Sequence, residues 1–324
     1  MTADLIGRAG PLPPELLPDH AEVSPDGGLR LAGCDPLQLA AEYGTPLFVY
    51  DEEHLRTRCR EAVTAFGPGV AYATKAFLCT AMAQLVHEEG MHLDVATGGE
   101  LHVALAAGVP ATDLVMHGNN KSPVELRRAL EVDVGRLVVD CFEEIDRIEA
   151  LVAEGLPRPT VLVRVTPGVE AHTHEFVQTG QDDSKFGFGL HHGAAAAAVE
   201  RLRRSDAVDL VGLHAHIGSQ VFVADSFHHA VELMAPFVVE QGLPELSIGG
   251  GLGVPYVVGE EAPSITEWAE AVQRACREAG IEARVTGEPG RASAAAAAVA
   301  RSTVGAVGGV AGIRTSGAGE GGWW

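Results

Sequence analysis

Short apolar, β-branched runs alternate with amphipathic stretches along most of the chain. Eight of these runs have the length and composition of strands. They are Val70–Lys75, His92–Ala96, Leu114–His117, Leu137–Asp140, Val161–Thr166, Leu210–His216, Leu246–Gly249 and Ala283–Glu288. Because helix-like segments separate the runs, the pattern predicts a parallel sheet.

The segments between the strands carry apolar residues at helical spacing. The predicted helices are Glu100–Ala107, Ser122–Leu130, Phe142–Ala153, Phe227–Val239 and Ile265–Ala279. Eight strand-helix units in roughly 220 residues favour an α/β fold, a (β/α)₈ barrel of the TIM type. The alternative is an open, doubly wound sheet in which the strands have been miscounted.

The two ends of the chain lie outside this repeating pattern. The predicted domains are an N-terminal segment that contributes to a β-domain (1–45), the barrel (46–291) and a remnant of a C-terminal β-domain (292–324). The barrel segment opens with a strand candidate at Pro46–Tyr50 and a helix over Glu52–Phe66. The Ala- and Gly-rich C-terminal segment predicts only a weak strand, over Ser302–Val310, so the second β-domain is expected to be incomplete.

Charge and cysteine usage exclude several classes of protein. There are 44 acidic residues and 23 Lys or Arg, which gives a net charge of −21 and argues against nucleic acid or an anionic membrane as partner. The five cysteines form no C-x-x-C pair and are odd in number. This favours a reduced, cytoplasmic compartment and gives no spacing for a zinc site, so we expect no metal.

Polar residues follow the apolar runs where the predicted strands end. Active-site groups of such barrels lie at these C-terminal ends. The residues are Lys75, Asp94, His117, Asp140, Arg164, His214, His216, the run Gly249–Gly251, Glu288 and Arg291. A single buried His or Asp is usually just hydrogen-bonded, but eight converging strand ends favour a functional site.

Lys75 is one of only three lysines in the sequence, with Lys121 and Lys185. At a strand end its amine would be partly desolvated, which favours the neutral, nucleophilic form. The alternative is a lysine that extends to the barrel rim to reach water.

Two glycine-containing turns and a histidine segment complete the predicted chemistry. Backbone N–H groups in the run Gly249–Gly251 are suited to a phosphate, although the run is also explained as a tight turn. Glu288 is suited to a protonated ring nitrogen, and the segment 214–219 supplies an imidazole to stack on a ring and a hydroxyl for the phosphate. A nucleophilic lysine, a phosphate cradle and an acid for a ring nitrogen together indicate pyridoxal 5′-phosphate (PLP).

Seven segments in family order give the sequence its resemblance to a known family. They are Tyr72-Ala-Thr-Lys-Ala76, Asp94-Val-Ala-Thr-Gly-Gly-Glu-Leu101, His117-Gly-Asn-Asn-Lys-Ser122, Asp183-Ser-Lys-Phe-Gly187, His214-Ala-His-Ile-Gly-Ser-Gln220, Gly249-Gly-Gly-Leu-Gly253 and Glu288-Pro-Gly-Arg291. With these segments the chain resembles the PLP-dependent decarboxylases that have an alanine-racemase-like barrel, and most closely their diaminopimelate decarboxylase branch.

The resemblance implies a role for each matching residue. Lys75 would bind PLP covalently as the catalytic lysine, His216 would stack on its ring, and Glu288 would pair with the ring nitrogen. The residues implied in the phosphate site are Ser219, Gly250, Gly251 and Gly290, with Pro289 beside them. Arg291 would contact both the cofactor and the substrate. The implied reaction converts meso-2,6-diaminopimelate to L-lysine and CO₂ in lysine biosynthesis.

The C-terminal part departs from the family pattern. Family members carry a Cys-Glu-Ser-x-Asp segment and distal tyrosines after the Glu-Pro-Gly-Arg turn, whereas here no cysteine follows Cys276 and no tyrosine follows Tyr256. A frameshift or truncation near Thr315 is the expectation, with impaired turnover and loss of the homodimer that the resemblance implies. The departure from the family pattern also predicts that the strand at Pro46–Tyr50 is left unpaired. Two other functions stay open: a related ornithine- or arginine-type decarboxylase, and a non-catalytic PLP-binding protein.

Overall fold

The computed structural model describes residues 13–24, 28–168, 185–303, 305–310, 313–318 and 322–323. The chain divides into two compact units. One unit comprises residues 58–254 and 261–293, and the other comprises 1–57, 255–260 and 294–324. The candidate chemistry lies in the first of these units.

The first unit is built on eight parallel strands in the order β12-β11-β10-β8-β7-β6-β5-β4. Their bounds are β4 Ala71–Ala73, β5 His92–Val95, β6 Leu114–Met116, β7 Arg136–Val139, β8 Thr160–Thr166, β10 Asp209–Ala215, β11 Glu245–Ser247 and β12 Arg284–Thr286. A two-residue strand, β9 Phe188–Gly189, pairs with β8 beside this path. All eight predicted strands are therefore confirmed.

Two hydrogen bonds connect the last strand segment back to the first. The N–H of Ala71 donates to the carbonyl of Gly287 at 3.1 Å, and the N–H of Ala73 donates to the carbonyl of Pro289 at 3.3 Å. The eight strands therefore close into a barrel, and the open-sheet alternative is wrong.

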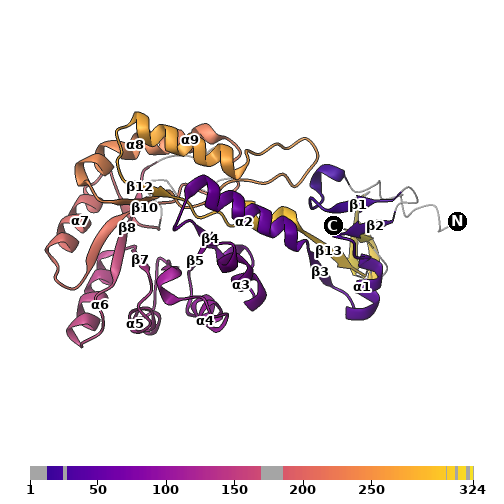
Figure 1. Ribbon diagram of the computed structural model, residues 1–324, viewed down its shortest axis with the longest axis horizontal. Helices are drawn as coiled ribbons and strands as arrows, with labels where there is room; N and C mark the ends of the chain where they lie inside the picture. The colour runs from indigo at the N-terminus through magenta and orange to yellow at the C-terminus, as the bar shows by residue number, and fades with distance from the viewer. Residues whose placement is uncertain are drawn as a thin grey trace. The chain divides into compact units, whose positions relative to one another are not determined.

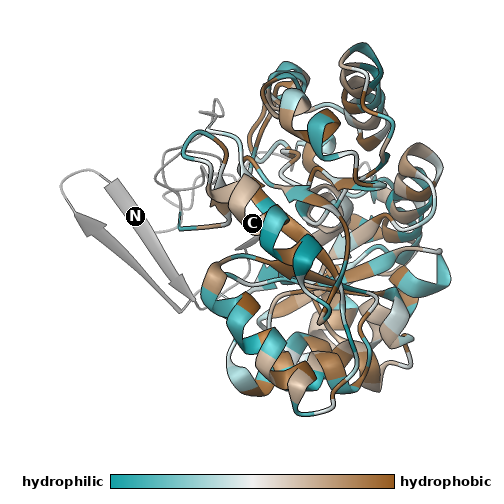
Figure 2. Ribbon diagram, turned by 90° about the vertical axis from the view of Figure 1, so that its left-hand side faces the viewer, coloured by the Kyte–Doolittle hydropathy of each residue, from teal (hydrophilic) through white to brown (hydrophobic). Residues whose placement is uncertain are grey.

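Amphipathic helices follow the strands and surround them (Figure 1). Their bounds are α2 Glu52–Phe66, α3 Thr80–Glu88, α4 Gly98–Ala106, α5 Pro123–Glu131, α6 Phe142–Ala153, α7 Ala194–Arg204, α8 Ala224–Gln241, α9 Ile265–Glu278 and α10 Arg291–Ala294. Both hydrophilic and hydrophobic residues lie along these helices in Figure 2, as expected for helices with one face on a core. The six helices predicted from periodicity are confirmed; α3, the Ala-rich α7 and the four-residue α10 were missed.

Local sequence fixes where two of these helices begin. Ser122 precedes α5 and accepts a hydrogen bond from the N–H of Glu125, whose carboxylate accepts one from the N–H of Ser122. Ser264 and Glu267 form the same capping box at the start of α9. Each box satisfies N–H groups that a helix start leaves without a partner.

The alternation of side chains along the strands places the polar groups above an apolar core. Ala71, Val115, Val138 and Leu162 form a buried cluster with Val211 packed against it. His117, Asp140 and Arg164 each lie two residues beyond a member of that cluster. Because side chains two apart on a strand share a face, these three point to the same interior.

The second unit contains short antiparallel sheets. Its elements are the pair β1 Ala21–Val23 and β2 Leu29–Leu31, the sheet of β16 Gly322–Trp323, β13 Ala298–Ser302 and β3 Leu47–Tyr50, the pair β14 Gly305–Val310 and β15 Ile313–Ala318, and the helix α1 Pro36–Tyr43. Leu29, Leu31 and Val299 form its buried cluster.

Two predictions about this unit need correction. β3 was expected to be unpaired, but it pairs antiparallel with β13, from Leu47 opposite Arg301 to Tyr50 opposite Ala298. The strand β13 itself was missed because its Ala-rich sequence has no strand-like pattern, whereas the expected strand over Ser302–Val310 overlaps β14.

None of the helices in the described part of the chain is long and apolar enough to cross a membrane.

Candidate active site

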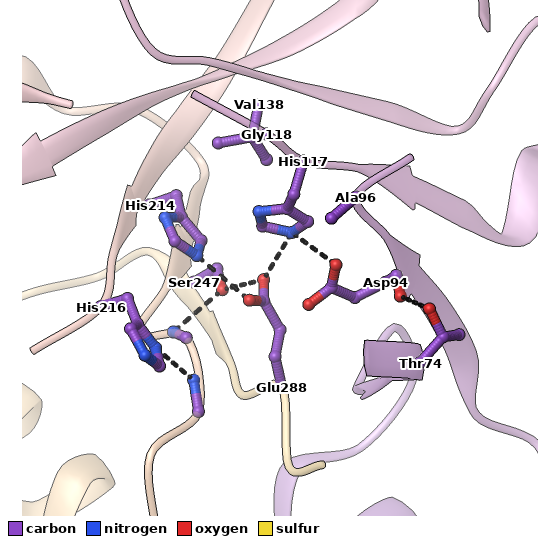
Figure 3. A network of polar contacts seen from close by, with 12 residues as sticks. Thr74, Asp94, Ala96, His117, Gly118, Val138, His214, His216, Ser247 and Glu288 are labelled. Atoms are coloured by element: carbon purple, nitrogen blue, oxygen red, sulfur yellow. Dashed lines mark hydrogen bonds and ion pairs between the residues drawn. The ribbon is translucent and has the colours of Figure 1, made fainter. Parts of the chain in front are cut away.

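The polar residues at the strand ends lie together in the barrel interior (Figure 3). Asp94, His117, His214 and Glu288 are all buried. Asp94 and His214 lie in β5 and β10, and His117 and Glu288 follow β6 and β12. Buried ionisable groups require charged or hydrogen-bonding partners, since an isolated charge is strongly disfavoured in a protein interior. Their partners are one another.

Glu288 occupies the centre of this group. Its Oε1 accepts a hydrogen bond from the Ser247 hydroxyl at 2.7 Å, and its Oε2 lies 3.1 Å from Nε2 of His214. Burial raises the pKa of Glu288, but the positive charge of His117 and the hydrogen bond from His214 outweigh burial and hold the pKa well below its ordinary value. Glu288 is therefore a buried carboxylate that stays ionised at neutral pH.

His117 lies between two carboxylates. Its Nε2 is 3.4 Å from Oε1 of Glu288 and 3.6 Å from Oδ1 of Asp94. Burial lowers the pKa of His117, but the charges of Asp94 and Glu288 outweigh burial, so the pKa is raised and the imidazolium is favoured. Burial raises the pKa of Asp94 to about 6, against the opposing charge of His117. The two residues form a pair with a protonated ring facing a carboxylate.

His214 carries no charge at neutral pH. Burial lowers its pKa to about 4 despite the nearby carboxylate of Glu288. A neutral ring has one N–H, and a carboxylate only accepts, so Nε2 carries the proton that it donates to Glu288. The ring of His214 also meets that of His117 edge-on, with centroids 4.9 Å apart.

His216 contacts the glycine turn after β11. Its Nδ1 accepts a hydrogen bond from the N–H of Gly250 at 3.2 Å, so the proton of the neutral ring is on Nε2. Burial, followed by the charges of Lys75 and Arg164, holds the pKa of His216 well below its ordinary value. The ring is thus a neutral aromatic surface beside a backbone turn.

The glycine turn fits closely against neighbouring backbone. A Cβ at Gly250 would lie 2.3 Å from the carbonyl oxygen of Glu288, and one at Gly251 would lie 2.2 Å from that of Gly218. Gly249 and Gly251 also have φ values of +65° and +109°, which only glycine adopts without strain. Glycine is therefore required at these positions.

The remaining predicted residues lie in the turn after β12. Arg291 begins α10, and its Nη2 donates to the hydroxyl of Ser219 at 3.2 Å. A Cβ at Gly290 would lie 2.9 Å from the Cβ of Ala73, so the turn packs directly on β4. Pro289 supplies the carbonyl of the barrel-closing hydrogen bond.

Lys75 lies one turn beyond its strand. β4 ends at Ala73, and Lys75 belongs to a 3₁₀ turn over Thr74–Ala76, where its side chain is exposed. The predicted partial desolvation is therefore wrong, because the turn moves the amine off the strand end. Its charge still acts on Asp94 and His216, so the amine lies on the side of the barrel where they do.

The other two lysines lie in different surroundings. Lys121 is buried, and its Nζ donates to Glu144 and to the carbonyl of Val138, each at 2.6 Å. Lys185 is exposed and lies over the Phe186 ring at 5.2 Å. Residues 183 and 184 of the same motif lie outside the described residues. Lys75 is thus the exposed lysine whose charge acts on the buried cluster.

Arg164 and Asp140 form a second charged pair in the interior. Nη1 of Arg164 is 3.7 Å from Oδ1 of Asp140, and its guanidinium lies over the Phe186 ring at 4.5 Å. Oδ2 of Asp140 accepts a hydrogen bond from the N–H of Gly187 at 3.0 Å. The pair therefore holds Phe186 and Gly187 against the barrel interior.

Sequence reasoning missed Ser247, which is 3% exposed and bonds to Glu288. It lies inside an apolar run, two residues before the first glycine of the turn. A hydroxyl residue in a buried strand was the available signal, because a buried hydroxyl needs a partner.

His117, His214 and Glu288 also lie close enough to resemble a metal-ligand set, with ligand atoms within 4.8 Å of one another. The contacts that the structure shows among the three are a hydrogen bond between Nε2 of His214 and Glu288 and an ion pair between His117 and Glu288. The arrangement is a hydrogen-bonded carboxylate, which is the group that a protonated ring nitrogen requires.

The residues present therefore fit a pyridoxal cofactor. A buried ionised carboxylate suits the ring nitrogen, a turn without Cβ atoms suits a phosphate, a neutral imidazole lies beside it, and a lysine amine is accessible.

Comparison with known proteins indicates the same cofactor. Residues 52–295 match the family model "Pyridoxal-dependent decarboxylase, pyridoxal binding domain". The chain is 47% identical over 270 residues to a diaminopimelate decarboxylase of Mycobacterium tuberculosis, covering 80% of this chain and 60% of that protein. It is 46% identical over 263 residues to the Bacillus subtilis enzyme of that name, covering 78% and 60%. The chain thus spans about three fifths of the length of these relatives.

Solved structures share the fold. A diaminopimelate decarboxylase from M. jannaschii in complex with L-lysine has a TM-score of 0.84 at 28% identity, covering 92% of this chain and 73% of that one. The Helicobacter pylori enzyme with L-lysine has a TM-score of 0.79 at 26% identity, covering 87% and 72%. With the family model matched across the whole barrel, the chain belongs to the pyridoxal-dependent decarboxylases.

Proposed function

We propose that this protein catalyses the PLP-dependent decarboxylation of meso-2,6-diaminopimelate to L-lysine and CO₂. The observation that carries the proposal is Glu288, a buried carboxylate kept ionised at the end of a barrel that also presents Lys75. The identity of 47% to a diaminopimelate decarboxylase supports the choice of substrate.

Each candidate residue of the barrel has a separate role in this proposal. PLP, when bound, supplies an electron sink for the electron pair released as CO₂ leaves. Lys75 holds the cofactor, and Glu288 keeps a proton on its ring nitrogen. Ser219 and the N–H groups of Gly251 and Gly290 bind the phosphate, whereas Gly250, expected in the same site, has its N–H directed to Nδ1 of His216. Arg291 donates a hydrogen bond to Ser219, and its guanidinium N–H groups orient the substrate carboxylate.

Reduction with borohydride tests the cofactor assignment. In PLP-loaded protein we expect a pyridoxyl label on Lys75 alone, because the Lys121 amine is buried in an ion pair and the charge of Lys75 acts on Asp94 and His216. Peptide mass spectrometry locates the label. Lys185→Arg is the matched control and keeps the label, whereas Lys75→Arg loses it. A label on Lys121 or Lys185 would refute the assignment.

Turnover tests the substrate. Release of CO₂ from meso-diaminopimelate, with no release from L-ornithine or L-arginine, is the expected result. Release from ornithine or arginine supports the related decarboxylases instead. A Lys75 label without release from any of the three supports a non-catalytic PLP-binding protein.

We also propose that the protein acts in the cytoplasm. All five cysteines are free thiols, which suits a reducing compartment. The family resemblance implies a homodimer, whereas the departure of the C-terminal segment from the family pattern predicts its loss. Light scattering coupled to size exclusion separates the two: a mass of twice 33.8 kDa supports the dimer, and a mass of 33.8 kDa supports its loss.

A further inference from the structure

The orientation of Glu288 depends on residues that have no assigned role. A carboxylate has about four acceptor positions. Oε1 faces Ser247 at 2.7 Å and His117 at 3.4 Å, and Oε2 faces His214 at 3.1 Å. The contacts with Ser247 and His214 are hydrogen bonds, whereas the contact with His117 is an ion pair, since its Nε2 has no hydrogen-bond partner among the described residues. The acceptor position that faces none of these three groups is on Oε2.

The donors are themselves fixed. Ser247 and His214 are 3% and 1% exposed and lie opposite each other in the register of β10 and β11. The hydroxyl of Ser247 also accepts the N–H of Gly249 at 3.2 Å, so its own proton is directed to Glu288. The edge-on contact between the rings of His214 and His117 limits the rotation of both.

We propose that Ser247 and His214 are positioning residues, which hold the Glu288 carboxylate in one orientation and leave a single acceptor position for the ring nitrogen of the cofactor. This inference rests on the PLP-binding part of the proposed function. It does not depend on which amino acid is decarboxylated.

The two donors have complementary effects on Glu288. Ser247 fixes Oε1 and His214 fixes Oε2, so rotation of the carboxylate breaks both hydrogen bonds. His117 adds a positive charge beside Oε1 and thereby favours the ionised form. Without the two donors the carboxylate would turn toward the imidazolium of His117 as its strongest remaining partner, and the ring nitrogen would lose its acceptor.

The test compares PLP with its deaza analogue, in which a C–H replaces the ring nitrogen. Dissociation constants are measured by equilibrium dialysis for both ligands. We expect Ser247→Ala and His214→Asn each to weaken PLP binding about tenfold, the usual effect of losing a hydrogen bond to a charged group. Binding of the deaza analogue should change less than about twofold, because it makes no hydrogen bond to Glu288.

Two further variants serve as controls. His214→Gln keeps an N–H near the position of Nε2 and should restore most of the PLP affinity. Ser293→Ala removes an equally buried hydroxyl that faces the carbonyl of Pro289 instead of Glu288, and should leave the ratio of the two dissociation constants unchanged.

The outcomes separate this inference from the proposed function. Equal weakening of both ligands by Ser247→Ala and His214→Asn shows a merely structural role and overturns the inference alone, as does unchanged binding of both. If wild-type protein does not bind PLP, both proposals fail. If the ratio changes as expected but meso-diaminopimelate is not decarboxylated, only the choice of substrate fails.

Discussion

Lys121→Met lowers the free energy of unfolding by about 3–5 kcal/mol, the usual effect of breaking a buried ion pair by removing one partner. Lys121 is 2% exposed, and its Nζ uses all three N–H groups, on Glu144, Val138 and Gly118. The variant leaves the Glu144 carboxylate buried without its cation. Urea denaturation of wild type and variant measures the difference.

The loss should also depend on pH. Burial raises the pKa of Glu144, and the charge of Lys121 opposes this, so removing Lys121 raises the pKa of Glu144 further. The folded variant then binds a proton that the unfolded chain releases, and its stability rises as the pH falls through the folded pKa. The deficit should be smaller at pH 5 than at pH 8. Equal deficits would contradict the role of an unpaired carboxylate.

The double variant Lys121→Met, Glu144→Leu is the control for this prediction. It removes both charges and should recover most of the lost stability, because an apolar pair of similar volume replaces a buried ion pair at little cost. The N–H of Asp140 loses its acceptor on Glu144, which was 3.0 Å away, so recovery stays incomplete by about 1–3 kcal/mol.

Gly251→Ala lowers the free energy of unfolding by about 2–4 kcal/mol and weakens PLP binding by at least about tenfold. At a φ of +109° the new Cβ would be strained, and it would lie 2.2 Å from the carbonyl oxygen of Gly218. The contact is with backbone and not with a flexible side chain, so the backbone of the turn has to move. Denaturant titration and equilibrium dialysis with PLP measure the two effects.

Gly253→Ala is the matched control in the same turn. Its Cβ would meet the Phe222 ring at 3.1 and 3.2 Å and the carbonyl oxygen of Val221 at 3.3 Å, whereas the Cβ at Gly251 would lie only 2.2 Å from a backbone carbonyl oxygen. We expect a clearly smaller loss of stability and near-normal PLP binding. If Gly253→Ala has the larger effect on PLP binding, the tight packing of Gly251 is not what shapes the phosphate turn.

The barrel could be predicted from sequence because its strands are short apolar runs that end in polar residues. Val138 lies in the core and Asp140 follows it in the interior, so a single run shows both the strand and its end. The strand β13 could not be predicted in this way, because its alanines carry no alternation and its pairing with β3 connects residues about 250 positions apart.

The members of the site could also be predicted, but not their contacts. His117, His214 and Glu288 each stood out as a polar residue at a strand end, yet the sequence does not show that they surround one carboxylate. Ser247 could not be predicted for the same reason, since its hydrogen bond is to Glu288, 41 positions away. The surroundings of Lys75 depend on a single 3₁₀ turn that the strand pattern does not signal.

The closure of the barrel through Ala71 and Gly287 has a consequence for synthesis on the ribosome. The chain emerges from its N-terminus, so β4 is made early and keeps an unpaired edge until the last strand arrives more than 200 residues later. Glu288 is part of that last segment. Nascent chains that end before it therefore lack both the closing hydrogen bonds and the carboxylate, and we expect them to depend on chaperones and to bind no cofactor.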